Sequence, residues 1–355
     1  MRHSLVGSAH RIGAGALAIQ VAAGRGHDTI GPMWTAYWTT WPGNGELRAE
    51  AERDPGPGEA IVRTLRSGVS RGTELLVHRG EVPAEVAATM RAPFQVGDLP
   101  GPVKYGYLSV GVVEAGPTEL VGRRVFCLHP HQDRYVVPVT ALVPVPDDVP
   151  SDRAVLAGTV ETAVNALWDA APRLGDRVAV IGAGMVGGAV AALLRTFPLG
   201  RLELVDVNPA RAALADALGV TWRRPDDAAG ECDLVIHCSA SEAGLARGLE
   251  LLGAEGELVE MSWYGTRAPR VPLGAAFHAR RLRIRASQVG AVAAARRARR
   301  TPADRLALAL GLLADPAFDA FLTGRAPFSR LPATMAALAD DPTALCQVVT
   351  YPEGD

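Results

Sequence analysis

Gly182, Gly184 and Gly187 have the spacing of a phosphate-binding turn. They follow a strand-like apolar segment, 177–181, and open a helix-like run of small residues. Gly182 permits a tight turn, Gly184 removes the side chain where a pyrophosphate approaches the backbone, and Gly187 lets the helix pack closely on the strand. Because the first N–H groups of that helix are free and its dipole is positive there, the turn predicts a dinucleotide site.

An acidic residue after the next apolar run extends this site. Asp206 lies 19 residues beyond Gly187, where a carboxylate meets the hydroxyls of the adenosine ribose. A carboxylate repels a 2′-phosphate, so Asp206 favours NAD, and Arg211 leaves NADP as the less favoured alternative. Ligands of such sheets bind at the carboxyl ends of the strands. Further cofactor contacts are therefore expected from Met185, Val186, Val207, Cys238, Ser239 and Ser262.

The first half of the chain contains side chains suited to acid–base chemistry. Lys104 is the only lysine among 36 basic residues, and Tyr107 follows three positions later. An ammonium lowers the pKa of a nearby phenol, and both groups can donate to a carbonyl oxygen. His129 and His131 have the spacing that places two rings on one face of a strand. They are candidates for a substrate pocket, with metal binding or a hydrogen-bonded structural role as alternatives.

Composition limits the kinds of partner. The chain has 355 residues, 48% of them hydrophobic, and a formal net charge of −2, which predicts two globular domains and neither nucleic acid nor an anionic membrane as a partner. No apolar run approaches the roughly 20 residues of a membrane helix. The four cysteines are scattered, which argues against a disulfide framework and a four-cysteine zinc lobe and favours the reducing cytoplasm.

The order of elements changes midway along the chain. Short strands separated by Gly and Pro are expected at 46–52, 59–67, 110–114, 124–128 and 134–138. A helical crossover at 151–168 leads into strands at 177–181, 202–206, 233–237, 256–261 and 282–286, separated by helices. A helix at 306–314 and a late strand at 346–350 follow, and a basic cluster at 296–300 is expected on a solvated helix face. Residues 1–32, rich in small residues, are expected to be a disordered extension.

Three further motifs accompany the glycine turn and Asp206: Gly68-Val-Ser-Arg-Gly-Thr-Glu74, Gly106-Tyr-Leu-Ser-Val-Gly-Val-Val113 and Glu161-Thr-Ala-Val-Asn-Ala-Leu167. Together they resemble the medium-chain dehydrogenase/reductase superfamily over roughly residues 45–350. The Ser-Arg-Gly-Thr-Glu and Lys-Tyr-Gly-Tyr sequences are similar to those of the subgroup containing bacteriochlorophyllide dehydrogenase. The resemblance implies an α/β protein: a GroES-like β-barrel catalytic domain (33–155 and 300–355) plus a Rossmann domain with a doubly wound parallel sheet (156–299).

The chain departs from the zinc-dependent members of that superfamily at the metal. Ser70 and Arg71 stand where those enzymes carry a cysteine, Tyr107 and Leu108 replace their His-Glu pair, and their third ligand falls near Gly158. Zinc needs three or four N, S or O ligands in fixed geometry. We therefore expect no catalytic zinc at this place.

Without a metal, a side chain must handle the hydroxyl proton. The resemblance implies that Thr73 matches the hydroxyl that relays protons in zinc-dependent relatives. Glu161, at the start of the crossover helix and near the expected nicotinamide, is an alternative base, and a structural role is equally open. The catalytic candidates are thus Lys104, Tyr107, Thr73, Glu161, His129 and His131.

The leading hypothesis is an NAD-dependent, zinc-independent oxidoreductase that interconverts a secondary alcohol and a ketone of a small-molecule substrate. One alternative is an NADPH-dependent reductase of activated double bonds, like the quinone and enoyl reductases of the superfamily. Another is a non-catalytic protein that keeps the dinucleotide as a structural or sensing ligand. By analogy with its relatives, the chain is expected to form a homodimer or homotetramer.

Overall fold

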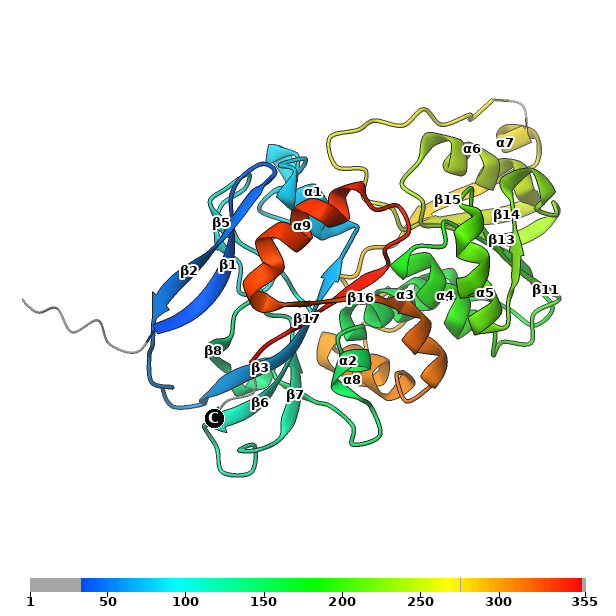
Figure 1. Cartoon of the computed structure of the whole chain (residues 1–355). Helices are drawn as coiled ribbons and strands as arrows, with labels where there is room; N and C mark the ends of the chain where they lie inside the picture. Colours follow the sequence, from blue (N-terminus) through cyan, green and yellow to red (C-terminus); the bar gives the residue numbers. More distant parts are fainter. Residues whose placement is uncertain (1–32, 275, 353–355) are drawn as a thin grey trace, which may run out of the picture.

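The computed structural model describes residues 33–274 and 276–352. The predicted extension, 1–32, lies outside the described residues. Figure 1 shows two parts side by side, the early strands β1 and β2 at one end and the parallel sheet with α4 to α6 at the other, with β17 and α3 between them. The fold class predicted from the sequence, a β-barrel-like domain joined to a Rossmann domain, is confirmed.

The first part of the chain, together with the late strands β16 (Leu322–Pro327) and β17 (Cys346–Thr350), forms two sheets within the described residues. One has the strand order β2-β1-β5-β4, and the other has the order β16-β17-β3-β6-β7-β9, with β8 also paired to β3. Burial alternates along much of β3, as expected for antiparallel strands with one face on a core. The strands are β1 (Met33–Trp41), β2 (Asn44–Ala51), β3 (Glu59–Ser70), β4 (Val96–Gly97), β5 (Val103–Lys104), β6 (Ser109–Ala115), β7 (Arg124–Cys127), β8 (Arg134–Pro138) and β9 (Val143–Pro144).

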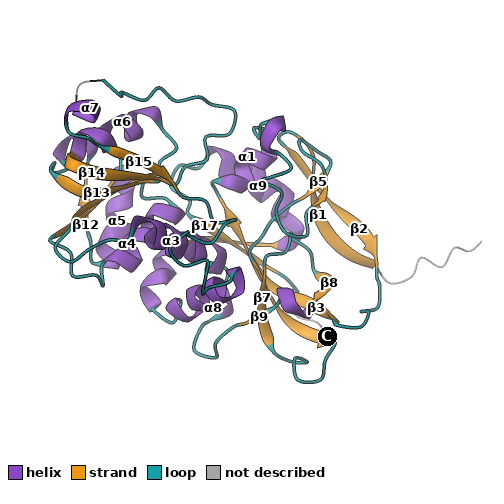
Figure 2. Cartoon of the chain, turned by 180° about the vertical axis from the view of Figure 1, so that it is seen from behind, coloured by secondary structure: helices purple, strands orange, loops and turns teal. Residues whose placement is uncertain are grey.

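The second part is a parallel sheet of order β12-β11-β10-β13-β14-β15, with helices on both faces (Figure 2). The central strands are continuous apolar runs because both of their faces are covered. The strand order reverses between β10 and β13, which creates a crevice at their carboxyl ends. The strands are β10 (Arg177–Ile181), β11 (Arg201–Val205), β12 (Thr221–Arg223), β13 (Cys232–His237), β14 (Leu252–Glu260) and β15 (Arg283–Ala286).

The helices connect and cover these sheets. The short α1 (Thr73–His78) follows β3, and the crossover consists of α2 (Ser151–Ala154) and α3 (Ala157–Ala170) rather than the single helix expected over 151–168. The remaining helices are α4 (Met185–Leu194), α5 (Ala212–Leu218), α6 (Glu242–Leu251), α7 (Ala276–Ala279), α8 (Pro302–Leu312) and α9 (Leu331–Asp340). Within the described residues no helix is long and apolar enough to cross a membrane.

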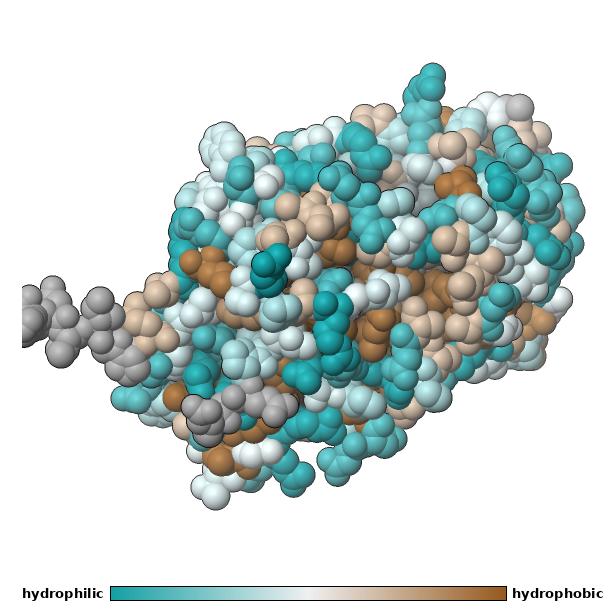
Figure 3. All heavy atoms as spheres, in the orientation of Figure 1, coloured by the Kyte–Doolittle hydropathy of each residue, from teal (hydrophilic) through white to brown (hydrophobic). Residues whose placement is uncertain are grey.

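The chain returns to the first part after the Rossmann sheet. β16 (Leu322–Pro327) pairs in parallel with β17 (Cys346–Thr350), and β17 pairs antiparallel with β3. A single apolar core cluster contains Phe126 of β7, Val180 of β10 and Val348 of β17, so the two parts share a core. Figure 3 shows mostly polar residues on one face, with apolar residues gathered mainly where the two parts meet.

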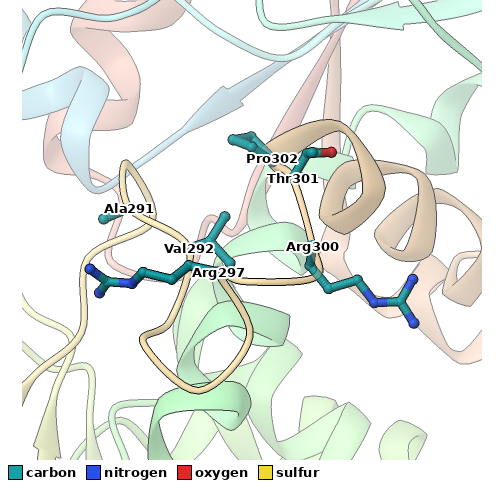
Figure 4. Close-up of a pocket in the computed structure, with 6 residues that line it drawn as sticks. All are labelled: Ala291, Val292, Arg297, Arg300, Thr301 and Pro302. Carbon is teal, nitrogen blue, oxygen red and sulfur yellow. The ribbon is translucent and has the colours of Figure 1, made fainter.

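One local prediction was wrong. The basic cluster 296–300 is exposed, as expected, but it lies in consecutive turns rather than on a helix. Beside it is an open depression of about 390 Å³ lined by Ala291, Val292, Arg297, Arg300, Thr301 and Pro302 (Figure 4). None of these six residues belongs to the motifs predicted to carry chemistry.

Candidate functional site

The glycine turn joins β10 to α4, and its shape explains each glycine. Gly182 has a φ of +99°, and a Cβ there would lie 2.7 Å from the backbone nitrogen of Ser239. A Cβ at Gly187 would overlap the carbonyl oxygen of Gly182. A Cβ at Gly184 would meet nothing within 4 Å, and no side chain caps the helix that begins at Met185. Gly184 thus leaves open space before free helix N–H groups, which is the cradle that a pyrophosphate requires.

Asp206 is hydrogen-bonded to the backbone of this turn. Its carboxylate accepts a hydrogen bond from the backbone N–H of Ala183 at 2.7 Å and another from Asn208 at 2.8 Å. It is half-buried, whereas Val207 beside it is 72% exposed. The carboxylate therefore holds the turn and the end of β11 together at the edge predicted to meet the adenosine ribose.

Arg211, the residue that left NADP as an alternative, is not at the surface. It is buried, and its guanidinium donates to the carbonyl oxygens of Pro342, Thr343 and Ala344 at 2.9–3.2 Å. Because these three carbonyls occupy it, Arg211 is not free to bind a 2′-phosphate. The side chain that weakened the preference for NAD is committed to the C-terminal segment.

A polar network lies on the other side of the turn, where β13 and β14 end. The buried imidazole of His237 contacts the Glu260 carboxylate through Nδ1 at 2.8–2.9 Å and the Ser239 hydroxyl through Nε2 at 2.6 Å. Ser262 donates its backbone N–H to Glu260 at 2.7 Å, and its hydroxyl accepts from the backbone N–H of Ala240 at 3.0 Å. The network holds two predicted cofactor residues, Ser239 and Ser262, in place.

Cys238, the third predicted contact in this region, packs differently from its neighbours. A Cβ at Gly187 would lie 3.2 Å from the Cβ of Cys238, and burial raises the pKa of the Cys238 thiol. The side chain therefore supports the turn as an apolar neighbour. The sequence analysis missed Glu260, which is one of three glutamates in β14 and is not distinguished from the others by the sequence.

Tyr107 occupies the junction between the barrel and α3. A Cβ at Gly158 of α3 would lie 3.7 Å from the Cδ2 atom of Tyr107. Burial, and then the charge of Glu74, raise the pKa of the Tyr107 phenol, and contacts with the Ser70 and Thr73 side chains oppose this shift. Tyr107 and the predicted Thr73 are therefore neighbours, and the phenol keeps its proton.

A series of buried, hydrogen-bonded side chains begins at Glu74, whose charge acts on Tyr107. Glu74 accepts from the Ser70 backbone N–H at 2.8 Å and contacts Nε2 of His131 at 2.8 Å. The other ring nitrogen of His131 contacts the Ser67 hydroxyl at 2.7 Å, which contacts the Tyr351 hydroxyl at 2.9 Å. The sequence analysis missed Glu74, Ser67 and Tyr351, and only the acid of the Gly-Thr-Glu turn offered a signal.

The two predicted histidines have separate surroundings. His131 belongs to the buried chain just described. His129 stacks on Tyr135 with ring centroids 3.7 Å apart, and its Nδ1 lies 2.9 Å from the Pro130 carbonyl oxygen. Burial lowers the pKa of His129 to about 3. Neither ring is placed with its neighbour as a ligand pair, so the structure favours the hydrogen-bonded alternative for both.

The expected Lys104–Tyr107 pair does not form. The Lys104 ammonium is buried and donates to Glu50 at 2.7 Å and to Gln132 at 3.0 Å. Glu50 also accepts from the indole N–H of Trp38 at 2.8 Å. The lysine thus ties β5 to β2 within the first sheet, since a buried ammonium requires a charged partner.

Glu161 is also committed. It is buried on α3 and accepts from Nε of Arg305 on α8 at 3.0 Å. The same guanidinium donates to Asn165 at 2.5 Å and to the carbonyl oxygen of Val289, also at 2.5 Å. Burial raises the pKa of Glu161, and the Arg305 charge opposes the shift. This arrangement is that of a structural ion pair between two helices rather than of a free base.

The positions that hold zinc in zinc-dependent members of the superfamily do meet in space. A Cβ at Gly158 would lie 2.7 Å from Cδ2 of Leu108. Leu108 contributes an alkyl side chain there, Tyr107 contributes a phenol, and Gly158 contributes no side chain. These residues do not provide the set of N, S or O ligands that zinc needs. Among the described residues no group of three or more His, Cys, Asp or Glu could hold a metal ion.

Comparison with known proteins identifies dehydrogenases. No family model matches the chain. L-threonine 3-dehydrogenase of Rhizobium rhizogenes is 30% identical over 118 residues, 33% of this chain and 34% of that protein. L-threonine 3-dehydrogenase of Deinococcus radiodurans is 25% identical over 215 residues, 51% of this chain and 58% of that protein. The matched segments thus span about a third to somewhat over half of these relatives' length.

Solved structures share the fold over nearly the whole chain. A short chain alcohol dehydrogenase from Escherichia coli in complex with NADH superposes with a TM-score of 0.73, at 16% identity, covering 90% of this chain and all of that one. 2R,3R-butanediol dehydrogenase from Bacillus subtilis superposes with a TM-score of 0.70 at 17% identity, covering 91% and 100%. At these identities the likeness shows the fold: the chain has the two-domain architecture of alcohol dehydrogenases.

Proposed function

We propose that the chain is a zinc-independent oxidoreductase of the medium-chain dehydrogenase/reductase superfamily that interconverts a secondary alcohol and a ketone with NAD(H). The observation that carries this proposal is the open cradle at Gly184 with the Asp206 carboxylate fixed beside it. The partial sequence similarity to L-threonine 3-dehydrogenases and the fold shared with alcohol dehydrogenases support the reaction class. The Ser-Arg-Gly-Thr-Glu sequence supports a place near the bacteriochlorophyllide dehydrogenase-like subgroup.

The residues around the turn divide the cofactor between two sides. The N–H groups at the start of α4 would hold the pyrophosphate, and Asp206 would meet the adenosine ribose. Ser239 and Ser262, across the switch point, would meet the other half. When bound, the nicotinamide supplies or accepts the hydride. The Arg211 guanidinium donates to backbone carbonyls and is not free to bind a 2′-phosphate. The repulsion between Asp206 and a 2′-phosphate is therefore not offset, and NAD is favoured over NADP.

Tyr107 is the group that we assign to the substrate oxygen. Its pKa is raised, mainly by burial, so the phenol stays protonated and donates a hydrogen bond to a carbonyl oxygen. As a hydride reaches the carbonyl carbon, negative charge develops on that oxygen, and a fixed donor stabilises it. Thr73, in contact with the phenol, relays the proton, and no role is left for Lys104 or Glu161.

Purified protein tests this proposal in two steps. Fluorescence titration is expected to show tighter binding of NADH than of NADPH. A panel of ketones is then expected to yield NADH oxidation that a strong chelator leaves unchanged. Stoichiometric zinc whose removal abolishes turnover would contradict the zinc-independent site. Activity confined to enones or quinones with NADPH would favour the double-bond reductase, and tight binding without turnover on any panel would favour the non-catalytic alternative.

A further inference from the structure

The His237–Glu260 pair lies in an unusual place for two polar side chains. In the parallel register the row across the sheet is Ile181, His237 and Glu260, the last residues of β10, β13 and β14. His237 is fully buried. Burying an imidazole and a carboxylate is costly unless their hydrogen bonds are satisfied. An apolar pair would complete the sheet at lower cost, so the polar pair calls for a role beyond packing.

The hydrogen bonds of this network can be arranged so that each group donates to the next one, from Gly244 to Glu260. The Gly244 backbone N–H donates to the Ser241 hydroxyl oxygen at 3.0 Å, and the Ser241 hydroxyl lies 2.8 Å from that of Ser239. Ser239 in turn contacts Nε2 of His237, whose Nδ1 faces the Glu260 carboxylate. With a neutral imidazole protonated at Nδ1, every proton in this chain has an acceptor: Gly244 donates to Ser241, Ser241 to Ser239, Ser239 to His237, and His237 to Glu260.

The reversed chain is less well satisfied. If Nε2 carried a proton, Ser239 would accept it and donate to Ser241, which already accepts from Gly244. The Ser241 hydroxyl proton would then be given to solvent, to which this half-exposed residue is open, instead of to a partner within the network. The arrangement that keeps every proton within the network has the Ser239 hydroxyl donating to the imidazole. Because the hydroxyl proton of Ser239 is then used on His237, Ser239 can only accept a hydrogen bond from a ligand.

The Ser239 hydroxyl lies at the start of α6, where a Cβ at Gly244 would overlap it, and the residue is half-buried. Its backbone nitrogen would be 2.7 Å from a Cβ at Gly182, so it borders the glycine turn. It lies across the switch point from Asp206, on the side of β13. An acceptor oxygen suits a ligand N–H or O–H and not a phosphate oxygen, which is itself an acceptor.

We propose that Glu260 and His237 are positioning residues that fix Ser239 as a hydrogen-bond acceptor for the nicotinamide-side half of the dinucleotide, its ribose hydroxyls or carboxamide amine. This inference rests on the proposed dinucleotide function. Glu260 and His237 act through Ser239, and the network leaves the pyrophosphate to the start of α4.

Two soluble probes separate the halves of the ligand. NADH carries both halves, whereas ADP carries only the adenosine and the two phosphates. Ser239→Ala is expected to weaken NADH binding about tenfold, the loss of one well-oriented hydrogen bond, and to leave ADP binding unchanged. Ser109→Ala, which removes a buried hydroxyl bonded to Tyr135 in the barrel, is the matched control and is expected to change neither affinity.

A double-mutant cycle tests whether Glu260 acts through Ser239. Glu260→Gln keeps the shape and weakens the acceptor for His237, so a loss of about threefold in NADH affinity is expected. In the Ser239→Ala background the same change is expected to have no further effect. Additive losses, equal losses for NADH and ADP, or unchanged NADH binding in Ser239→Ala would each overturn the proposal. Failure of the unmodified protein to bind NADH or NADPH would instead contradict the proposed function itself, and this inference with it.

Discussion

The two sides of the crevice solve the problem of holding reactants in different ways. On the Rossmann side the decisive feature is backbone, since glycines leave space and free N–H groups for a ligand. On the barrel side the polar side chains are paired with one another, from Glu74 through His131 and Ser67 to Tyr351. The Rossmann side has backbone groups open to a ligand, whereas this hydrogen-bonded chain of the barrel side is completed by its own side chains.

The largest expected effect tests the backbone side. In Gly187→Ala the new Cβ overlaps the Gly182 carbonyl, so α4 must move away from β10. We expect a loss of at least about 4 kcal/mol in the free energy of unfolding and no measurable NADH binding. Chemical denaturation and fluorescence titration provide the two readouts.

Gly184→Ala is the matched variant, because its Cβ meets nothing within 4 Å. It is expected to unfold like the unmodified protein while losing NADH affinity, since the methyl group fills the cradle. Equal stability of the two variants would show that the turn is not packed as described.

The barrel side is expected to lose stability when its chain is broken. Glu74→Ala leaves His131 without its acceptor and the Ser70 N–H unpaired in a buried place. We expect a cost of about 3 kcal/mol in the free energy of unfolding, as for other buried pairs that lose one member. Glu114→Ala, in a partly exposed cluster with Arg63 and Arg134, is the control and should cost less than about 1 kcal/mol. Comparable losses in both would remove the distinction.

Removing the Tyr107 hydroxyl should affect turnover and not binding. Tyr107→Phe is expected to lower kcat about a hundredfold, the usual cost of losing a donor to a developing oxyanion, with NADH affinity unchanged. Tyr105→Phe, whose ring lies 6.1 Å away edge-to-face, is the control and should retain kcat. A Tyr107→Phe enzyme with full turnover would place the proton donor elsewhere.

The smallest effect at neutral pH is a pH dependence of stability in the barrel, which grows as the solution becomes acidic. Because burial lowers the pKa of His129 from 6.5 to about 3 in the folded state, the unfolded chain takes up a proton first as pH falls. His129 therefore costs nothing above pH 6.5 and destabilises the fold progressively between pH 6.5 and 3, by up to about 1.4 kcal/mol per pH unit. His129→Phe, which retains a ring to stack on Tyr135, should show a shallower loss by urea denaturation across this range. Parallel pH profiles for both proteins would contradict the assignment.

The same contrast explains which parts of the site could be predicted from sequence. The glycines lie in one strand–turn–helix unit, and Asp206 follows the next strand at a spacing that recurs in dinucleotide sites, so both are readable from the sequence. Glu260 lies 23 residues from His237, and Tyr351 lies 284 residues from Ser67. Such contacts depend on sheet register, which residue patterns do not specify. The fold class followed from the alternation of short strands and then of strands and helices.

Misplaced candidates share a physical cause. Lys104 and Glu161 were singled out for their chemistry, and both are occupied by a partner far along the chain, Glu50 and Arg305. An ionisable group in a protein core must find a counter-charge, and sequence does not show whether that partner is a residue or a substrate. Tyr107, by contrast, lies at the junction with α3 and has no ionic partner there among the described residues.

The late strand β17 has a consequence for the order in which the molecule matures. β17 supplies the partner of β3, and Tyr351 closes the chain of hydroxyls behind Tyr107. During synthesis, the parallel sheet and its glycine turn are complete once about residue 286 has left the ribosome. The barrel side of the crevice is incomplete until residues 346–351 have been synthesised. On the proposed function, a nascent chain could bind the dinucleotide before β17 is present, and bound dinucleotide would favour the folded sheet during that interval.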